Sequence, residues 1–153
     1  ALNTLGGTLT AFPLSRVSRR GGKLLTMQSM SLTGAAGDDF QQHAVFIMST
    51  GEVIMYAGID PGSAAEWALV GVYSIAQPVG GSRCAMQVDG DVWVSTRQGY
   101  VLLREAIQKS GRARPHMLSG AGQDAARLYA ANTNWQGVYA PDQQMAFFNV
   151  PTG

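Results

Sequence analysis

The stretch "MYAGIDPGSAAEWALVGVY", residues 55–73, holds two apolar, strand-like runs separated by a short polar centre. Asp60-Pro61 is a pair that starts turns. Ser63 and Glu66 have the spacing of a capping box, in which a hydroxyl and a carboxylate each satisfy a backbone N–H. We therefore predict one helical turn over residues 60–66 that ends at Trp67 and joins two strands.

The rest of the chain contains more windows of the same kind, rich in Val, Ile, Tyr, Phe and Trp and bounded by Gly, Asp or Pro. They predict ten short strands, and so many in one chain indicate an all-β fold of antiparallel sheets. The expected strands cover residues 7–14, 23–32, 44–50, 52–58, 67–75, 84–88, 91–96, 100–103, 135–140 and 145–150.

Turn signals join these windows in pairs. Asp89-Gly90 is typical of a type I′ hairpin turn between two strands. Thr50-Gly51 and residues 141–143 are predicted to form the turns of two further hairpins. Gly51 and Gly90 are 39 positions apart, close to the ~40–45 residue period of propeller blades. The prediction is a chain that supplies two to three blades of a β-propeller.

A small helical insertion is expected at about 104–132, between blades. Residues 104–111 and 122–132 favour helix by composition, and a polar loop separates them. Residues 1–153 then form one segment of a propeller domain, and we expect the domain to be incomplete, because the last predicted strand needs a partner.

The composition excludes several classes of protein. Apolar residues make up 46% and charged residues 14%, and the net charge is +1, so no overall field attracts nucleic acid or a membrane. No apolar run approaches the roughly 20 residues of a membrane helix, and no signal peptide is recognisable. Cys84 is the single cysteine, which excludes an intrachain disulfide and indicates synthesis in a reducing compartment.

Acidic pairs are the first candidates for chemistry. Asp60 and Glu66 are possible partners for glycoside hydrolysis, which needs two carboxyl groups, but turn and cap roles explain both. Asp38-Asp39 offers oxygen ligands for calcium, yet further acidic ligands at the required spacing are missing. We predict that neither pair is a site.

The remaining chemical motifs are weak. His43 and His116 lack neighbouring ligands at metal spacing, and "SRRGGK" (18–23) departs from a phosphate-binding loop at Val17 and Leu24. We expect Cys84 to be a buried apolar residue. No catalytic residue, metal or cofactor is predicted, and the chain is not expected to be an enzyme.

Basic side chains gather in two loop-like stretches. One is formed by Arg16, Arg19, Arg20 and Lys23, and the other by Lys109, Arg112 and Arg114. Loops present such side chains to phosphates without reading base sequence, and the alternative is a solvated loop or a protein contact. The first cluster is the candidate site for DNA or partner contacts. Aromatic residues in the strands are expected to pack in the core instead: Trp93, Trp135, Phe147 and Phe148.

Three stretches together resemble a known family. "AVFIMSTGEVIMYAGIDPGSAAEWALVGVYSIAQPVGGSRC" (44–84), "VDGDVWVSTRQGYVLLREA" (88–106) and "NTNWQGVYAPDQQMAFFNVP" (132–151) are similar to a β-propeller protein of short-tailed bacteriophages and prophages, the tail nozzle or tail tubular protein B. The resemblance spans roughly residues 10–151. One difference is Tyr139-Ala140-Pro141, where a plain Tyr-Pro is expected.

The resemblance implies a structural virion protein, made in the host cytoplasm and located in the phage tail. Six copies would form a hexameric ring around the channel for double-stranded DNA ejection, in contact with the tail adaptor and with fibre or spike proteins. The alternatives are a propeller binding module or adhesin and, with less support, a propeller glycosidase using the Asp38 to Asp60 region.

Overall fold

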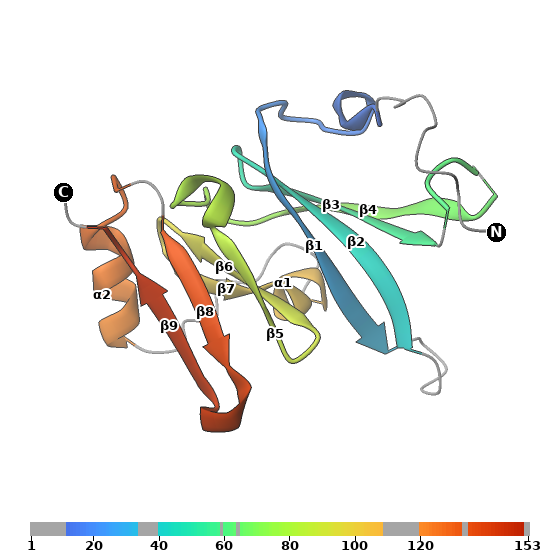
Figure 1. Cartoon of the computed structure of the whole chain (residues 1–153). Coiled ribbons are helices and arrows are strands. Elements are labelled where there is room, and N and C mark those ends of the chain that lie inside the picture. The colour runs from blue at the N-terminus through green and yellow to red at the C-terminus, as the bar shows by residue number, and fades with distance from the viewer. Residues whose placement is uncertain are drawn as a thin grey trace, which may run out of the picture.

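The computed structural model describes residues 12–33, 40–58, 60–63, 65–108, 120–132 and 135–151. This part of the chain is mostly β-structure and forms three antiparallel sheets (Figure 1). It does not close into a barrel or a propeller. None of its helices is long and apolar enough to cross a bilayer.

The first sheet has four strands in sequence order, each antiparallel to the next. Its strands are β1 (Leu24–Thr33), β2 (Phe40–Met48), β3 (Glu52–Gly58) and β4 (Trp67–Ser74). The pairing register shifts once between Leu24 and Thr26 and once between Met55 and Tyr56. Such irregularities increase the local twist of a sheet.

The second sheet has three strands and the third has two. They comprise β5 (Ala85–Val88), β6 (Asp91–Thr96) and β7 (Gly99–Leu102), then β8 (Gln136–Ala140) and β9 (Met145–Asn149). The helices are α1 (Leu103–Gln108) and α2 (Gly120–Leu128), with short 3₁₀ turns η1 (Leu14–Arg16), η2 (Gly81–Arg83) and η3 (Pro141–Gln143).

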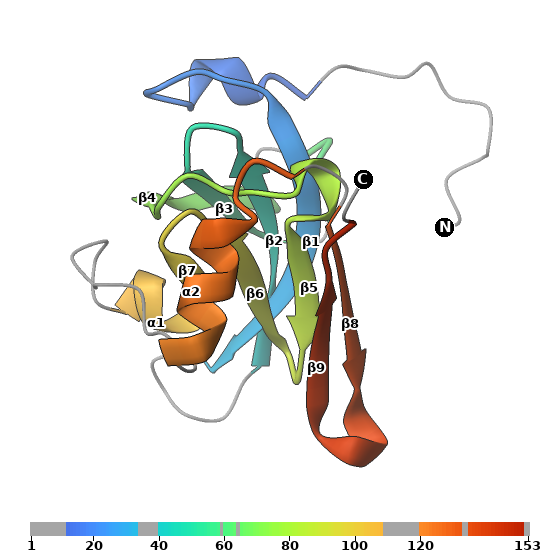
Figure 2. The same ribbon diagram turned by 90° about the vertical axis from the view of Figure 1, so that its left-hand side faces the viewer.

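Three hydrophobic clusters arrange these elements in layers. The inner face of the four-stranded sheet packs on the three-stranded sheet through buried residues that include Val45, Val53 and Val94. On its far side, the three-stranded sheet meets α2 and the β8–β9 hairpin around Trp135, whose side chain is fully buried. Figure 2 shows α2 in front of β6 and β7, with the hairpin beside β5.

The two end layers expose apolar side chains. On the outer face of the four-stranded sheet, Met27 is 60% and Leu69 46% exposed, beside a buried cluster around Phe46 and Tyr56. On the outer face of the hairpin, Val138 pairs with Phe147 across the strands, and these side chains are 49% and 46% exposed. The layered stack therefore ends in apolar surface on both sides.

Most of the predicted strands are confirmed to within a few residues, and the Asp89-Gly90 turn has the positive φ at both positions that its sequence indicates. The first predicted strand is wrong where it is described, since Phe12 and Pro13 form no strand and Leu14 begins a 3₁₀ turn, and residues 7–11 lie outside the described residues. The helical insertion is two separate helices, and residues 109–119 between them lie outside the described part.

The 39-residue spacing does not relate equivalent turns. Gly51 lies between the second and third strands of its sheet, whereas Gly90 lies between the first and second strands of the next one. The two turns therefore lie at opposite ends of antiparallel strands that run side by side, as the bond from the Ser31 N–H to the Gly90 carbonyl indicates (2.9 Å). Three strands, β3, β4 and β5, separate the two turns, and an odd number of antiparallel strands places them at opposite ends, which residue spacing alone does not reveal.

Candidate functional site

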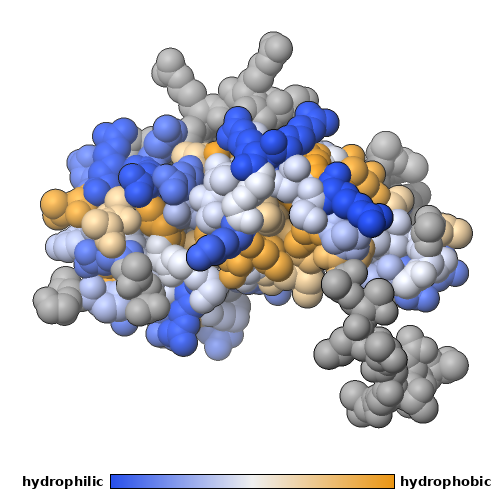
Figure 3. Space-filling view, turned by 90° about the horizontal axis from the view of Figure 1, so that it is seen from above, coloured by the Kyte–Doolittle hydropathy of each residue, from blue (hydrophilic) through white to orange (hydrophobic). Residues whose placement is uncertain are grey.

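The predicted basic cluster lies in the segment that leads into β1. Arg16 ends η1, Arg19 and Arg20 follow in a loop, and Lys23 precedes the strand; all four side chains are exposed. Figure 3 views the molecule from above, looking down on this end, and shows strongly hydrophilic side chains standing out over paler and apolar ones. The structure thus brings the four predicted residues into one exposed segment.

The beginning of this segment is fixed by apolar packing on the outer face of the four-stranded sheet. Phe12 stacks on Phe46, with ring centroids 5.7 Å apart, and meets the edge of Tyr56 at 5.2 Å. Leu14 and Val17 pack against the same buried cluster. The backbone on the N-terminal side of the arginines is therefore held by the sheet.

The centre of the segment is fixed by Glu52, the first residue of β3. The side chain of Glu52 is only 2% exposed, and its carboxylate accepts three hydrogen bonds. These come from the Ser18 hydroxyl (2.5 Å), the Arg19 N–H (3.0 Å) and the Arg20 N–H (3.0 Å). Glu52 is bonded to the backbone N–H groups of the two arginines, and their side chains are exposed.

The pKa of Glu52 reflects the same contacts. Burial by itself raises the pKa of this carboxyl group, but the hydrogen bonds from Ser18, Arg20 and Arg19 and the charge of Arg20 outweigh it, so the pKa is lowered from 4.5. Hydrogen bonds to the charged form favour ionisation. Glu52 is therefore a carboxylate at neutral pH, and it holds the loop as an anion.

The end of the segment is tied to the turn between β2 and β3. The Lys23 N–H donates to the Ser49 hydroxyl (3.0 Å), the Ser49 N–H donates to the Lys23 carbonyl (2.8 Å), and the Thr50 hydroxyl donates to the Gly21 carbonyl (3.1 Å). Gly21 itself adopts a positive φ of 66°, which glycine accommodates without strain. The loop is anchored at its beginning, its centre and its end.

The exposed cations of this loop are not engaged elsewhere in the described structure. No hydrogen bond or ion pair from the side chains of Arg16, Arg19, Arg20 or Lys23 occurs within the described residues. Their hydrogen bonds are made by backbone groups, and Arg20 also interacts with the Glu52 carboxylate through its charge. Rigidly mounted, unpaired cations bind phosphate groups at a low cost in loop ordering, and this is the chemistry that the arrangement supports.

The loop over residues 60–66 is built differently from the prediction. The Ser63 N–H donates to the Asp60 carbonyl (3.1 Å) and the Glu66 N–H to the Ser63 carbonyl (3.0 Å), so two successive turns replace the helical turn. The Asp60 side chain accepts the Gly62 N–H (2.8 Å). The predicted capping box does not form, because the Glu66 N–H uses the Ser63 carbonyl instead of its hydroxyl.

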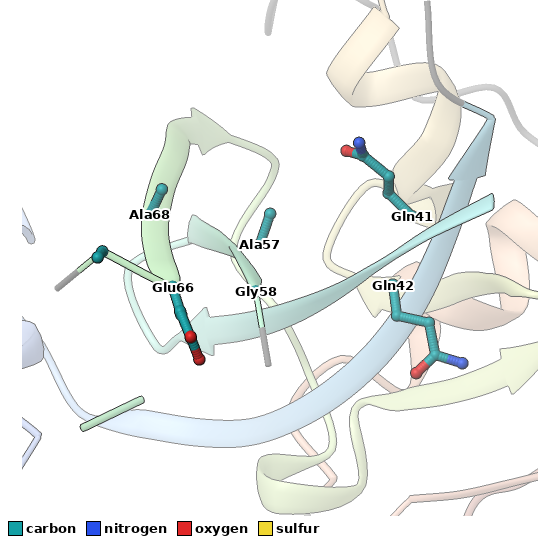
Figure 4. A pocket seen from close by; sticks show the side chains of 7 residues that line it. Gln41, Gln42, Ala57, Gly58, Glu66 and Ala68 are labelled. Carbon is teal, nitrogen blue, oxygen red and sulfur yellow. The ribbon is translucent and has the colours of Figure 1, made fainter. Parts of the chain in front are cut away.

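Glu66 also lines a surface pocket of about 480 Å³ between β2 and the start of β4 (Figure 4). Gln41 and Gln42 extend from β2 in opposite directions in that view, and the described lining contains no carboxylate other than that of Glu66. Asp60 is not part of this lining. The pair considered for glycoside hydrolysis therefore does not share this pocket, and Asp38 and Asp39 lie outside the described residues.

The other predicted residues have structural surroundings where they are described. His43 is buried, with Nδ1 2.9 Å from the Gln41 carbonyl; burial raises the pKa of the Cys84 thiol to about 11, as suits the expected apolar role. Among the described residues no cluster of three potential metal ligands occurs. His116 and the second basic stretch, Lys109, Arg112 and Arg114, lie outside the described part.

The aromatic residues mostly follow the prediction of core packing. Trp135 is fully buried, and Phe148 is partly buried and stacks on Tyr100 with centroids 4.1 Å apart. Phe147 is the exception, since it lies on the outer face of the β8–β9 hairpin. Its strand alternates between two faces, so neighbouring Phe147 and Phe148 necessarily point to opposite sides.

Glu52 is the residue that sequence reasoning missed. A signal was present: an acidic side chain directly after the Thr50-Gly51 turn begins one of the most apolar strands of the chain. A charge at a buried position needs partners, but its partners are more than 30 positions away.

The contacts of Glu52 and the exposure of the four cations are the basis for assigning a function to this segment. No protein family, characterised protein or solved structure was found to match this chain.

Proposed function

We propose that this chain is a structural, non-enzymatic component of a short bacteriophage tail. In this proposal it forms part of a nozzle-like wall around a DNA channel, as a ring of six copies that contacts the tail adaptor and fibre or spike proteins. The sequence resemblance is the origin of the proposal, and two features of the fold support it.

The observation that carries the proposal is the layered stack with apolar surface at both ends. Leu24, Met27 and Leu69 are exposed on the outer face of the four-stranded sheet, beside the part of that face that residues 12–17 cover, and Val138 and Phe147 are exposed on that of the hairpin. Exposed apolar patches of this kind mark surfaces that are covered in an assembly. A wall made of successive β-layers requires such faces, because each layer packs on the next.

The layered stack of sheets also agrees with a β-propeller architecture. Blades of a propeller are four-stranded antiparallel sheets packed face to face. The strand order β1-β2-β3-β4 is that of one such blade, and the next two sheets continue the packing with fewer strands. We propose that these are blade-like layers of a propeller.

The second supporting feature is the anchored basic loop. Cations on a fixed backbone can contact the phosphates of a duplex without reading its sequence. The loop that carries Arg16, Arg19, Arg20 and Lys23 has these properties, since Glu52 and the β2–β3 turn hold it. We propose that it faces the channel.

Electron microscopy of the protein, purified alone and in assembled particles, tests this proposal. Rings with six-fold symmetry at the end of a tail are the expected result. A monomeric protein that retains a soluble host ligand would contradict it and support the alternative, a propeller binding module or adhesin. Rings whose outer surface carries the basic loop would contradict the channel position.

A glycosidase has no specific support in the described residues, since the pocket beside Glu66 provides one carboxylate instead of two. Turnover of an oligosaccharide that is lost in an Asp60→Asn variant would contradict the non-enzymatic proposal.

A further inference from the structure

The antiparallel order of the strands sorts the loops between two ends of the molecule. The segment before β1, the β2–β3 turn, the connection from β4 to β5 and the β6–β7 turn meet at one end, which we call the basic end. The bond from the Ile75 N–H to the Gly51 carbonyl (2.8 Å) and that from the Arg97 N–H to the Gln77 carbonyl (2.9 Å) link these loops directly. Figures 1 and 2 both show η1 and η2 at this end.

Two further arginines reach the basic end from the three-stranded sheet. Arg83 ends η2, which packs beside β1, and Arg97 lies in the turn between β6 and β7. Both side chains are exposed. Neither belongs to the sequence cluster of Arg16 to Lys23, and only the fold brings them to the same end.

Acidic charge is scarce at the basic end. In the described loops there, the acidic residue is Glu52, whose carboxylate is buried and bonded to the loop backbone. The opposite end of the same sheets carries Asp60 and Glu66 before β4 and Asp89 and Asp91 around the β5–β6 turn, together with Arg104, whose side chain donates to the Ser31 carbonyl. The fold therefore keeps exposed acidic side chains away from the described loops of the basic end, although the whole chain has a net charge of only +1.

We infer that the basic end is one continuous binding surface for the phosphate backbone of duplex DNA, extending from the basic loop across Arg83 to Arg97. This inference deepens the proposed function and rests on it, because it names the residues that would face the DNA. The surface spans both sheets, so it presents cations over a wider area than the basic loop alone.

The composition of the loops favours a duplex over single-stranded nucleic acid. Proteins that hold single strands stack bases on aromatic side chains. No aromatic residue occurs in residues 14–23, 49–51, 75–84 and 97–98 of the basic end, and Phe12, which precedes them, packs on Phe46 and Tyr56. Loops with arginines contact phosphates without reading bases. Binding is therefore expected to be independent of DNA sequence.

A salt titration of DNA binding by the full chain tests the inference. Fluorescence anisotropy with a labelled duplex of about 30 base pairs gives the slope of log affinity against log salt, which is about −0.9 for each phosphate contact. Six contacts give a slope near −5 for the wild type. The double variant Arg83→Ala/Arg97→Ala is expected to bind more weakly, with a slope smaller in magnitude by about 2.

The matched control is Ser82→Ala/Gln98→Ala, which removes the exposed, uncharged neighbours of the two arginines. It should leave the slope unchanged. Equal slopes for the arginine variant and this control would overturn the inference, as would tighter binding to a single strand of the same length, or displacement of the duplex by anionic lipid vesicles at equal charge.

The outcomes separate this inference from the proposed function. If rings form and an Arg19→Ala/Arg20→Ala variant loses DNA binding while Arg83→Ala/Arg97→Ala does not, the extended surface is wrong and the tail proposal remains. If the arginine variant changes the slope as expected but no ring or tail particle contains the protein, the tail proposal is wrong and the DNA-binding surface remains.

Discussion

Two polar loops flank the four-stranded sheet, and they are held in opposite ways. Residues 18–23 are bound to Glu52, Ser49 and Thr50, which are 26 to 34 positions away in the sequence. Residues 60–66 are held by hydrogen bonds that span only two or three positions. The first loop is positioned by the tertiary fold, and the second forms its own turn.

A residue pattern that resembles an active site is therefore not always the part of the chain that the tertiary fold positions. Asp60, Ser63 and Glu66 attract attention because they are close in sequence, and that closeness already explains their contacts. The sequence of the basic loop is typical of a solvated loop, yet the buried carboxylate of Glu52 binds its backbone. A buried charge in a fixed network is costly unless it is fully bonded.

Replacing the two glutamates should show this contrast most strongly. Glu52→Ala removes three hydrogen bonds to a buried carboxylate and leaves two backbone N–H groups without their acceptor, so we expect a loss of about 3 kcal/mol in the free energy of unfolding. Glu66→Ala, at an exposed position, should cost less than about 0.5 kcal/mol. Urea unfolding monitored by tryptophan fluorescence measures both. Equal losses would show that the first loop is no better anchored than the second.

Two glycines provide a second comparison of somewhat smaller size. Gly51 has a φ of +82°, and a Cβ there would lie 2.5 Å from the Ile75 carbonyl oxygen, so Gly51→Ala should cost about 2 kcal/mol. Gly62 would meet only the side chain of Asp60, at 3.1 Å, so Gly62→Ala should cost about 0.5 kcal/mol or less. Thermal unfolding of the two variants checks the order. A larger loss at Gly62 would contradict the view that the turn beside Glu52 is the tightly packed one.

The local rules of sequence predicted most of the strands and one turn correctly for an identifiable reason. Alternation and bounding turn residues act over a few positions, so windows such as 52–58 and 91–96 match the strands β3 and β6. The Asp89-Gly90 turn follows from the positive φ that both positions require. These rules also explain the wrong prediction of a capped helical turn over residues 60–66. The Ser63 to Glu66 spacing fits a capping box and a simple turn equally well, so sequence alone does not distinguish them.

The candidate site was predicted only in its exposed part. Four basic residues near one another in sequence were visible, but Glu52, Arg83 and Arg97 join them through the pairing of strands far apart in the chain. Which end of a sheet a loop reaches depends on the number of strands between it and its neighbours in the chain, and three strands separate the Gly51 turn from the Gly90 turn. The gathering of these arginines at one end therefore could not be derived from residue spacing alone.

The pH dependence of stability gives the finest test of how the basic loop is held. Because the pKa of folded Glu52 lies below 4.5, its ionised form stabilises the fold above that pH, and this contribution is lost as the pH falls through the folded-state value. Asp91 acts in the opposite direction, since burial raises its pKa despite the hydrogen bonds from Val92 and Arg104. The wild-type profile alone therefore mixes two effects, and a comparison with Glu52→Gln separates them.

Near neutral pH the wild type should be more stable than this variant by about 1 kcal/mol, and the difference should shrink towards about pH 3 as Glu52 is protonated. A difference that stays constant between these conditions would mean that the loop is held by the shape of the side chain at position 52 and not by its charge.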